Sequence, residues 1–192
     1  MADRFASYEE LAKVFLEDRD YRVVTHAPDE YSWLIMAPHG GKIERGTSEL
    51  ARAVATDEHG LYLFEGLLQR ANRDLHVGSH RFFENRLDAL LAKSDYALGI
   101  HGRGDDDDPE TVFVGGRNAK LKTRLEDGLK EAGFKAQSEN HRLPGEHPKN
   151  TCNRCGSGAG VQLELPLTLR VRLLDQPERL ERMAGALRGG LA

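Results

Sequence analysis

The sequence is poor in cysteine and lacks long apolar runs. Its 192 residues include two cysteines, too few for the disulfide framework of a small secreted domain. No apolar run approaches the roughly 20 residues that a membrane-spanning helix needs. The first residues also lack the basic and then apolar plan of a signal peptide. We therefore expect a cytoplasmic protein without a membrane partner.

The sequence also lacks a large excess of charge of either sign. It has 27 Lys and Arg and 31 Asp and Glu, which gives a net charge of −4. Without a basic excess, no nucleic-acid partner is expected, and a polyanionic ligand would have to be held by local arginines. The length favours a single domain, residues 1–192, large enough to bury a substantial core. We expect a monomer, although no sequence feature fixes the oligomeric state.

Apolar runs typical of strands alternate with segments of helical periodicity along the chain. The predicted strands cover residues 21–25, 33–37, 61–66, 74–78, 95–100, 111–114 and 161–165. The predicted helices cover residues 7–18, 48–55 with Thr47 or Ser48 as N-cap, 87–93 and 117–131, with two short helices after Pro166, whereas residues 137–150 and 152–160 form loops. This order predicts an α/β fold with a mixed, mostly parallel sheet flanked by helices.

Two of the predicted strands end on a histidine that is followed by glycine, at His39 and His101. In an open α/β sheet, ligands bind at the carboxyl ends of strands. With Glu44 from the loop after His39, these residues form a set of two histidines and a glutamate, which is typical of hydrolytic zinc sites. Spacing alone leaves a second interpretation equally open, in which they are hydrogen-bonded loop residues.

Hydrolysis of an amide at such a site also needs a general base that is not a metal ligand. Glu164 is the candidate, because it lies between Leu163 and Leu165 on an apolar strand. A carboxylate in that setting is costly unless it is paired or functional. The residues alone slightly favour the alternative, an edge-strand glutamate that faces solvent.

An ordered set of motifs resembles the poly-γ-glutamate hydrolase family, a bacterial and phage group whose members have also been labelled phage-related replication proteins. The two specific blocks are HGGKIERGTSE at 39–49 and GVQLEL at 160–165. The weaker ones are LHVGSHRF at 75–82, His101-Gly102, VGG at 114–116 and Asn153-Arg154. The resemblance covers nearly the whole chain, from the first predicted helix to the last strand.

The resemblance implies a zinc carboxypeptidase-like α/β fold and endo-type cleavage of γ-glutamyl amide bonds. It places the zinc ligands on His39, Glu44 and His101, and the catalytic glutamate on Glu164. That glutamate would deprotonate the attacking water and then pass the proton to the leaving amine. The implied cofactor is Zn2+, and the implied substrate is a polyanionic γ-linked glutamate polymer or peptide.

Such a polymer carries one α-carboxylate per unit, which the planar guanidinium of arginine can bind at two points. Arg81, Arg103 and Arg154 lie next to matched motifs and are the candidates for substrate binding. Arg154 is also the first candidate for the cation that steadies the oxyanion. For each of them, an interpretation as a solvated surface arginine is about as good.

Other polar residues receive weaker assignments. His76 and His80 are expected to line the pocket or to orient a ligand, with a structural role favoured for His80. The two thiols of Cys152 and Cys155 are expected to pack a loop, since no second ligand pair accompanies them. The four histidines without motif support, His26, His59, His141 and His147, are expected at the surface, and residues 105–108 are expected to form a solvated turn.

Three functions therefore remain in competition. The first is a zinc-dependent hydrolase of poly-γ-glutamate. The second keeps the same residues but acts as an amidase or peptidase on peptidoglycan stem peptides, which also contain a γ-linked glutamate. The third is a non-catalytic binding protein associated with phage replication. The presence of His39, Glu44, His101 and Glu164 together argues against the third.

Overall fold

The computed structural model describes residues 3–106 and 108–191. Within them, seven strands form one mixed sheet in the order β1-β3-β2-β4-β7-β5-β6. The central strands β3, β2, β4 and β7 are parallel to one another, whereas β1 and β5 run antiparallel to their inner neighbours. The strands are β1 (Tyr21–His26), β2 (Trp33–Gly41), β3 (Gly60–Gly66), β4 (Tyr96–Arg103), β5 (Val112–Gly116), β6 (Ala136–Gln137) and β7 (Val161–Pro166).

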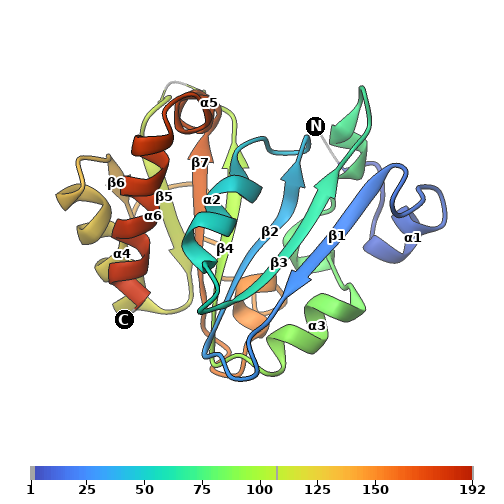
Figure 1. The fold of residues 1–192 in the computed structure, drawn as a ribbon, viewed down its shortest axis with the longest axis horizontal. Coiled ribbons are helices and arrows are strands. Elements are labelled where there is room, and N and C mark those ends of the chain that lie inside the picture. Colours follow the sequence, from blue (N-terminus) through green and yellow to red (C-terminus); the bar gives the residue numbers. More distant parts are fainter. Residues whose placement is uncertain (1–2, 107, 192) are drawn as a thin grey trace.

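Helices cover both faces of this sheet, so the predicted α/β architecture is confirmed (Figure 1). The α-helices are α1 (Tyr8–Ala12), α2 (Thr47–Ala55), α3 (Asn85–Leu91), α4 (Ala119–Glu131), α5 (Leu167–Asp175) and α6 (Pro177–Leu191). Three short 3-10 helices are η1 (Asn72–Leu75), η2 (Ser79–Arg81) and η3 (Thr151–Arg154). No helix of the described residues has the length and apolar character needed to cross a membrane.

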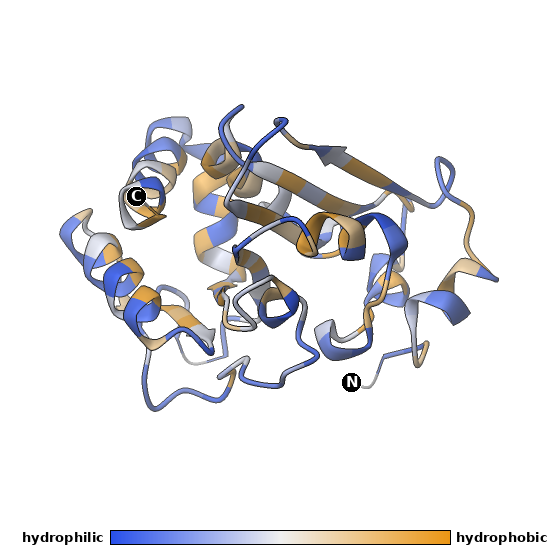
Figure 2. Ribbon diagram, turned by 90° about the horizontal axis from the view of Figure 1, so that it is seen from below, coloured by the Kyte–Doolittle hydropathy of each residue, from blue (hydrophilic) through white to orange (hydrophobic). Residues whose placement is uncertain are grey.

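Two hydrophobic cores lie on opposite faces of the sheet, because side chains alternate along each strand. Hydrophobic residues run through the strands, while the long loops are mostly hydrophilic (Figure 2). The first core joins strand residues Ile35, Ala37, Leu63, Ile100 and Leu163 to Leu50, Leu125, Leu173 and Leu187 of α2, α4, α5 and α6. The second core joins Leu34, Met36, Tyr62 and Phe64 to Leu11 of α1, Leu75 and Val77 after β3, Phe82, and Leu87 and Leu91 of α3.

Most predicted elements are confirmed, and the exceptions have local causes. The predicted strand at 74–78 is wrong: these residues form the end of η1 and a loop, and the N–H of His76 closes a turn onto the carbonyl of Arg73. Leu75 and Val77 alternate because both enter the second core, not because they pair with a strand. The two-residue strand β6 was not predicted, and its second residue, Gln137, is the first residue of the predicted loop 137–150.

The start of α2 also differs from the prediction. Its N-cap is Gly46, and neither Thr47 nor Ser48 caps it. Both hydroxyls are used by the preceding loop instead. The Thr47 hydroxyl donates to the carbonyl of Glu44 at 2.8 Å, and the Ser48 hydroxyl accepts from the N–H of Gly41 at 2.9 Å. The helix start therefore holds the loop that carries Glu44.

Candidate metal centre

An irregularity in β2 sets the direction of His39. Ala37 pairs with Leu63 of β3, but Gly40 pairs with Glu65, so β2 has one residue more than its partner in this stretch. Regular alternation from Ala37 would turn His39 towards the first core, whereas this bulge sends it to the second. There its Nε2 donates to the carbonyl of Val77 at 2.8 Å and its ring lies edge-on to Phe82.

His101 and Glu164 reach the same face without a bulge. Leu98 and Ile100 of β4 enter the first core, so His101 points to the other side. On β7, Leu163 and Leu165 belong to the first core, and Glu164 between them lies on the face of His101. The alternative interpretation, in which Glu164 faces solvent at a sheet edge, is therefore wrong, because β7 lies between β4 and β5.

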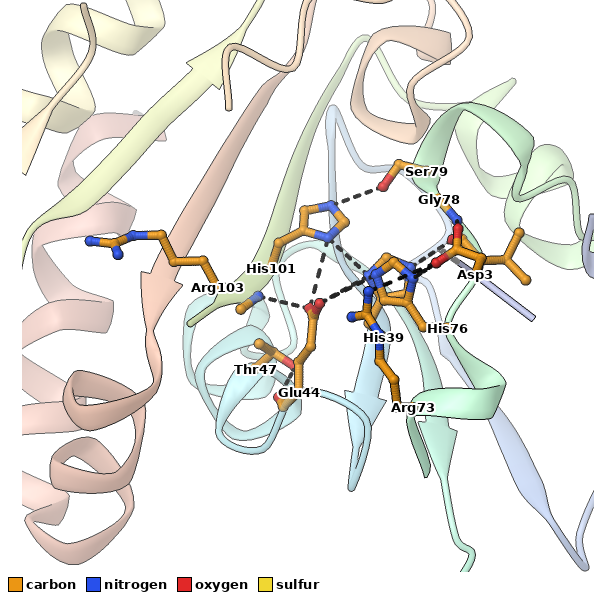
Figure 3. Close-up of polar contacts among 12 residues, drawn as sticks. Asp3, His39, Glu44, Thr47, Arg73, His76, Gly78, Ser79, His101 and Arg103 are labelled. Carbon is orange, nitrogen blue, oxygen red and sulfur yellow. Dashed lines mark hydrogen bonds and ion pairs between the residues drawn. The ribbon is translucent and has the colours of Figure 1, made fainter. Parts of the chain in front are cut away.

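The donor atoms of His39, Glu44 and His101 converge on one point, as predicted from the strand ends. The Nδ1 atoms of the two histidines are 3.2 Å apart, and they lie 3.4 Å and 4.0 Å from the nearest carboxylate oxygens of Glu44. Figure 3 shows Glu44 at the centre of these contacts. Zinc bound to nitrogen at 2.0–2.1 Å in tetrahedral geometry separates its ligands by roughly 3.4 Å. The donor set fits such an ion.

Second contacts orient the three donors for a metal. The Val77 carbonyl can only accept, so it fixes the proton of His39 on Nε2 and leaves Nδ1 for the ion. One oxygen of Glu44 accepts from the N–H of Gly102 at 2.7 Å. The Nε2 of His101 lies 3.5 Å from the hydroxyl of Ser79. All three ligands are buried, so their geometry is set by packing.

The electrostatics match a cation site that lies between an acid and several imidazoles. Burial by itself would raise the pKa of Glu44, but His39, His101 and His76 outweigh it and lower the pKa to about 2. Burial and then the charge of His39 lower the pKa of His101 to about 3. Glu44 is therefore ionised and His101 neutral at pH 7, which are the forms that bind a metal ion. Burial by itself would lower the pKa of His39, but Glu44 and the Val77 carbonyl outweigh it and raise this pKa, so a metal ion would have to displace a proton from Nδ1 of His39.

Glu164 differs from Glu44 in its titration. Burial and then the negative charge of Glu44 raise the pKa of Glu164 to about 8. Its Oε1 accepts a hydrogen bond of 3.1 Å from the side-chain amide of Gln162, which lies on the same face of β7. A carboxyl with this pKa can take up and release a proton near neutral pH, as general acid–base chemistry requires.

A cleft of about 830 Å³ opens over these residues. His39, Glu44, His101 and Glu164 all line it, together with segment 142–147, which was expected only to be a loop. That segment is held down by Asn153, whose side-chain amide donates to the carbonyls of Gly145 and His147 at 2.8 Å and 3.0 Å. The site is thus a covered groove and not an open patch.

The three predicted substrate-binding arginines are placed differently. Arg103 lines the cleft, but its guanidinium stacks 4.1 Å from the ring centroid of Phe113 and donates to four carbonyls of residues 104–111. It points away from the ligand cluster (Figure 3). Arg81 bonds to Asp3 at 2.8 Å and Arg154 to Asp88 at 2.5 Å, and neither is among the described residues that line the cleft. A direct role in binding stays a prediction that these positions do not support.

His76 was expected to line the pocket or orient a ligand, and it lines the cleft together with His80. The ring of His76 lies 3.9 Å from that of His39, and its Nε2 is 3.6 Å from Glu44. Its Nδ1 bonds to Asp3 at 2.7 Å, and Asp3 also accepts from the N–H of Gly78 and from Arg81. The N-terminal segment thus orients a histidine beside the site, a contact that no sequence pattern indicated.

A buried arginine, Arg170, connects the segments that carry the candidate metal donors and Glu164. Arg170 of α5 donates to the carbonyls of Leu165 in β7, of Arg45 next to Glu44, and of Arg103 at the end of β4. Its guanidinium packs directly on Gly102, where an added Cβ would lie 2.5 Å from Cζ. This arginine joins three segments that carry the site, and its position in an apolar helix gave no earlier signal.

Several remaining assignments are settled by contacts. His147 is exposed, as expected, and it also lines the cleft, as do Arg73 and Arg142. Cys152 and Cys155 are buried free thiols in the second core, as expected. The turn at 105–108 is more than solvated: the carboxylate of Asp105 accepts from the N–H and the hydroxyl of Thr168. Residue 107 of that turn lies outside the described residues.

Comparison with known proteins agrees with this geometry. Three curated Bacillus subtilis (strain 168) proteins are similar over about nine tenths of this chain. The SPbeta prophage-derived UPF0714 protein YoqZ is 37% identical, over 91% of this chain and 62% of the length of YoqZ. The UPF0714 protein YndL is 35% identical over 89% of this chain and 67% of YndL, and the UPF0714 protein YmaC is 31% identical over 90% of this chain and 73% of YmaC. The chain therefore spans a little under two thirds of the length of YoqZ.

Two solved structures have the same fold over nearly their whole length. A bacteriophage poly-gamma-glutamate hydrolase superposes with a TM-score of 0.93 at 29% identity, covering 99% of this chain and 97% of its own. The zinc-free apo form of YndL gives a TM-score of 0.90 at 32% identity, covering 99% and 98%. The family model of poly-gamma-glutamate hydrolases matches residues 5–185. The chain belongs to the poly-γ-glutamate hydrolase family.

Proposed function

We propose that this chain is a zinc-dependent hydrolase that cleaves γ-glutamyl amide bonds, with poly-γ-glutamate as its substrate. The observation that carries the proposal is the meeting, in one cleft, of three buried metal donors with a fourth carboxyl of raised pKa. His39, Glu44 and His101 supply the donors and Glu164 the carboxyl. The match of residues 5–185 to the family of poly-γ-glutamate hydrolases supports the choice of substrate.

The residues divide the chemistry between them. His39, Glu44 and His101 would hold zinc, which would polarise the scissile carbonyl and lower the pKa of water. The ionised form of Glu164, a minority at pH 7 because its pKa is about 8, takes the proton of the attacking water and then returns it to the nitrogen of the leaving amine. Its pKa, raised by burial and by Glu44, suits both transfers, because the proton is neither too weakly nor too strongly held.

Substrate carboxylates would meet cations at the border of the cleft. Arg73 and Arg142 are exposed and line it, whereas the guanidinium of Arg103 is occupied by carbonyls. Arg142 is paired with Asp106, and Arg73 lies 3.9 Å from Asp3. The pair of Arg142 with Asp106 is exposed on both sides and therefore weak, and the contact of Arg73 with Asp3 is long, so an incoming carboxylate can replace either partner. We therefore assign the binding of α-carboxylates to Arg73 and Arg142.

The test is the chain length of poly-γ-glutamate after incubation with purified protein, followed by gel filtration. Cleavage should stop when a chelator removes the metal and return when zinc is added. Peptidoglycan stem peptides assayed in parallel would identify the amidase alternative if they alone are cut. Retention of DNA at physiological salt without any hydrolysis would favour the binding protein. Full activity after complete metal removal would overturn the proposal.

A further inference from the structure

A row of side-chain amides leads from the segment before η3 to Glu164. We propose that Asn150 and Gln162 are positioning residues that occupy Oε1 of Glu164, so that Oε2 is the oxygen that exchanges the proton. The inference deepens the proposed function and rests on it, since it takes Glu164 as the base. It is carried by the hydrogen bonds of two buried amides that the reaction does not otherwise use.

The orientation of the first amide is fixed by the backbone. The N–H of Cys152 donates to Oδ1 of Asn150 at 3.4 Å, and a backbone N–H can only donate. The hydroxyl of Thr151 donates to the same oxygen. Oδ1 of Asn150 is therefore committed to η3, and its Nδ2 must point the other way. Nδ2 donates to Oε1 of Gln162 at 2.7 Å.

The orientation of the second amide follows from the first. Because Oε1 of Gln162 accepts from Asn150, its Nε2 has to face the opposite side. There it donates to Oε1 of Glu164 at 3.1 Å and to the carbonyl of Leu143 at 3.4 Å. A carbonyl can only accept, so Leu143 confirms the direction independently. The row of bonds has a single direction, from the Cys152 backbone to the Glu164 carboxylate.

Packing prevents the second amide from turning over. Gln162 and Asn150 are buried, with exposed fractions of 4% and 7%. Gly145 lies against the Gln162 amide so closely that an added Cβ would be 2.4 Å from Cδ. Gly145 also has a φ of 64 degrees, in the left-handed region that favours glycine. The covering segment thus closes directly over the amide that contacts Glu164.

The decisive experiment compares Asn150→Asp with Asn150→Ala. Aspartate keeps the cap of η3 but replaces the Nδ2 donor by an oxygen, so Gln162 must turn over and present Oε1 to Glu164. We expect Asn150→Asp to lower kcat about ten- to hundredfold at unchanged KM, and Asn150→Ala to lower it less. If Asn150 only stabilised the fold, Asn150→Ala would lower kcat more than Asn150→Asp, because aspartate caps a helix better than alanine. We expect the Tm, in contrast to kcat, to fall more in Asn150→Ala than in Asn150→Asp.

Asn118→Asp is the matched control, since Asn118 caps α4 away from the cleft and the change adds the same charge. Its kcat should equal that of the wild type. If Asn150→Asp is as active as Asn150→Ala or more active, the positioning role is wrong. Should Glu164→Gln itself cleave normally, the assignment of the base fails and this inference fails with it, whereas a wild type that does not cleave poly-γ-glutamate would overturn the proposed function.

A second measurement does not depend on turnover. The side-chain amide signal of Gln162 in nitrogen-15 NMR spectra is identified by its disappearance in Gln162→Leu. We expect this signal to shift in Asn150→Asp, which removes the donor to Oε1 of the amide, and in Glu164→Gln, which replaces the carboxylate that accepts from its Nε2 by a neutral carbonyl. A signal that stays in place in both variants would overturn the inference, whatever substrate the enzyme cleaves.

Discussion

His101 and Glu164 are direct partners on the neighbouring parallel strands β4 and β7. The first is a candidate metal ligand and the second the candidate base. Strands lie about 4.8 Å apart in a sheet, so the sheet itself sets the spacing between ligand and base. Sites built on strands hold their geometry better than sites built on loops. The chemistry of this protein would thus depend on its most rigid element.

Removal of one ligand should remove the metal. We expect His39→Ala to lose a zinc content that is about one ion per chain in the wild type, because two remaining donors leave an incomplete site. Metal analysis after dialysis measures this. His59→Ala, a change outside the cleft, should keep its zinc. A variant at His39 with undiminished zinc would place the metal elsewhere.

Removal of the base should separate metal binding from catalysis. Glu164→Gln keeps the size of the side chain but cannot take up the proton, so we expect kcat to fall by about 10²- to 10⁴-fold. The zinc content should stay at the wild-type level, since Glu164 is not among the three converging donors. Single-turnover assays and metal analysis on the same sample check both. Normal cleavage by this variant would contradict the assignment.

The candidate histidine ligands could be found from a local pattern, whereas Glu164 became the candidate base through the family resemblance. His39 and His101 end apolar runs, and Glu164 alternates with leucines. The direction of His39 could not be predicted, because it depends on a bulge of one residue between β2 and β3. A bulge depends on the partner strand, which the local pattern does not contain.

The residues around the ligands were harder to predict for a related reason. Arg81 and Arg154 lie next to matched motifs in the sequence, yet each forms an ion pair with a carboxylate outside the cleft. Conversely, Arg142 and His147 line the cleft from a segment without periodicity. Where a loop side chain points depends on contacts that are distant in sequence. Asp3, which bonds to His76 across 73 positions, is the extreme case.

Loss of a cation at the cleft should weaken substrate binding. We expect Arg142→Ala to raise KM for poly-γ-glutamate several-fold with little change in kcat, since a contact made equally in ground and transition states affects KM alone. The effect should shrink at high salt, because Arg142 is exposed. Arg182→Ala on α6 removes the same charge far from the cleft and should leave KM unchanged. An equal KM effect of both variants would indicate long-range attraction only.

Asp3 should link stability to pH. Burial alone would raise the pKa of Asp3, but His76, the N–H of Gly78 and Arg81 outweigh it and lower the pKa below 3.8. A carboxyl with a lowered folded pKa stabilises the fold above its ordinary pKa, and this contribution is lost as pH falls through the folded value. The difference in Tm between wild type and Asp3→Asn should therefore be full at pH 7 and shrink below pH 3.8.

The size of that difference can be bounded. A lost hydrogen bond to a charged group costs about 1.5–3 kcal/mol, and each kcal/mol shifts Tm by about 2–4 °C in a chain of this length. Thermal unfolding followed by circular dichroism measures it. Asp74→Asn, which removes an exposed pair with Arg4, should have a smaller effect. Equal shifts for both variants at pH 7 would argue against a special role of Asp3.

The two thiols should be inert in the folded protein. Both Cys152 and Cys155 are buried, and burial, followed by the charge of Cys155, raises the pKa of Cys152. The thiolate is the reactive form, so iodoacetamide should leave Cys152 unmodified in native protein and alkylate both cysteines after unfolding. Mass spectrometry of the intact chain counts the adducts. Rapid alkylation of Cys152 in native protein would show that the second core opens readily.

The contact between Gly102 and Arg170 predicts how related sequences can vary. Any side chain at position 102 would collide with the guanidinium, and a smaller residue at 170 would leave three carbonyls without their donor. Neither position can therefore change alone without loss of stability. Across relatives, glycine and arginine should be inherited as a pair, and a homologue that has lost one should have replaced the other.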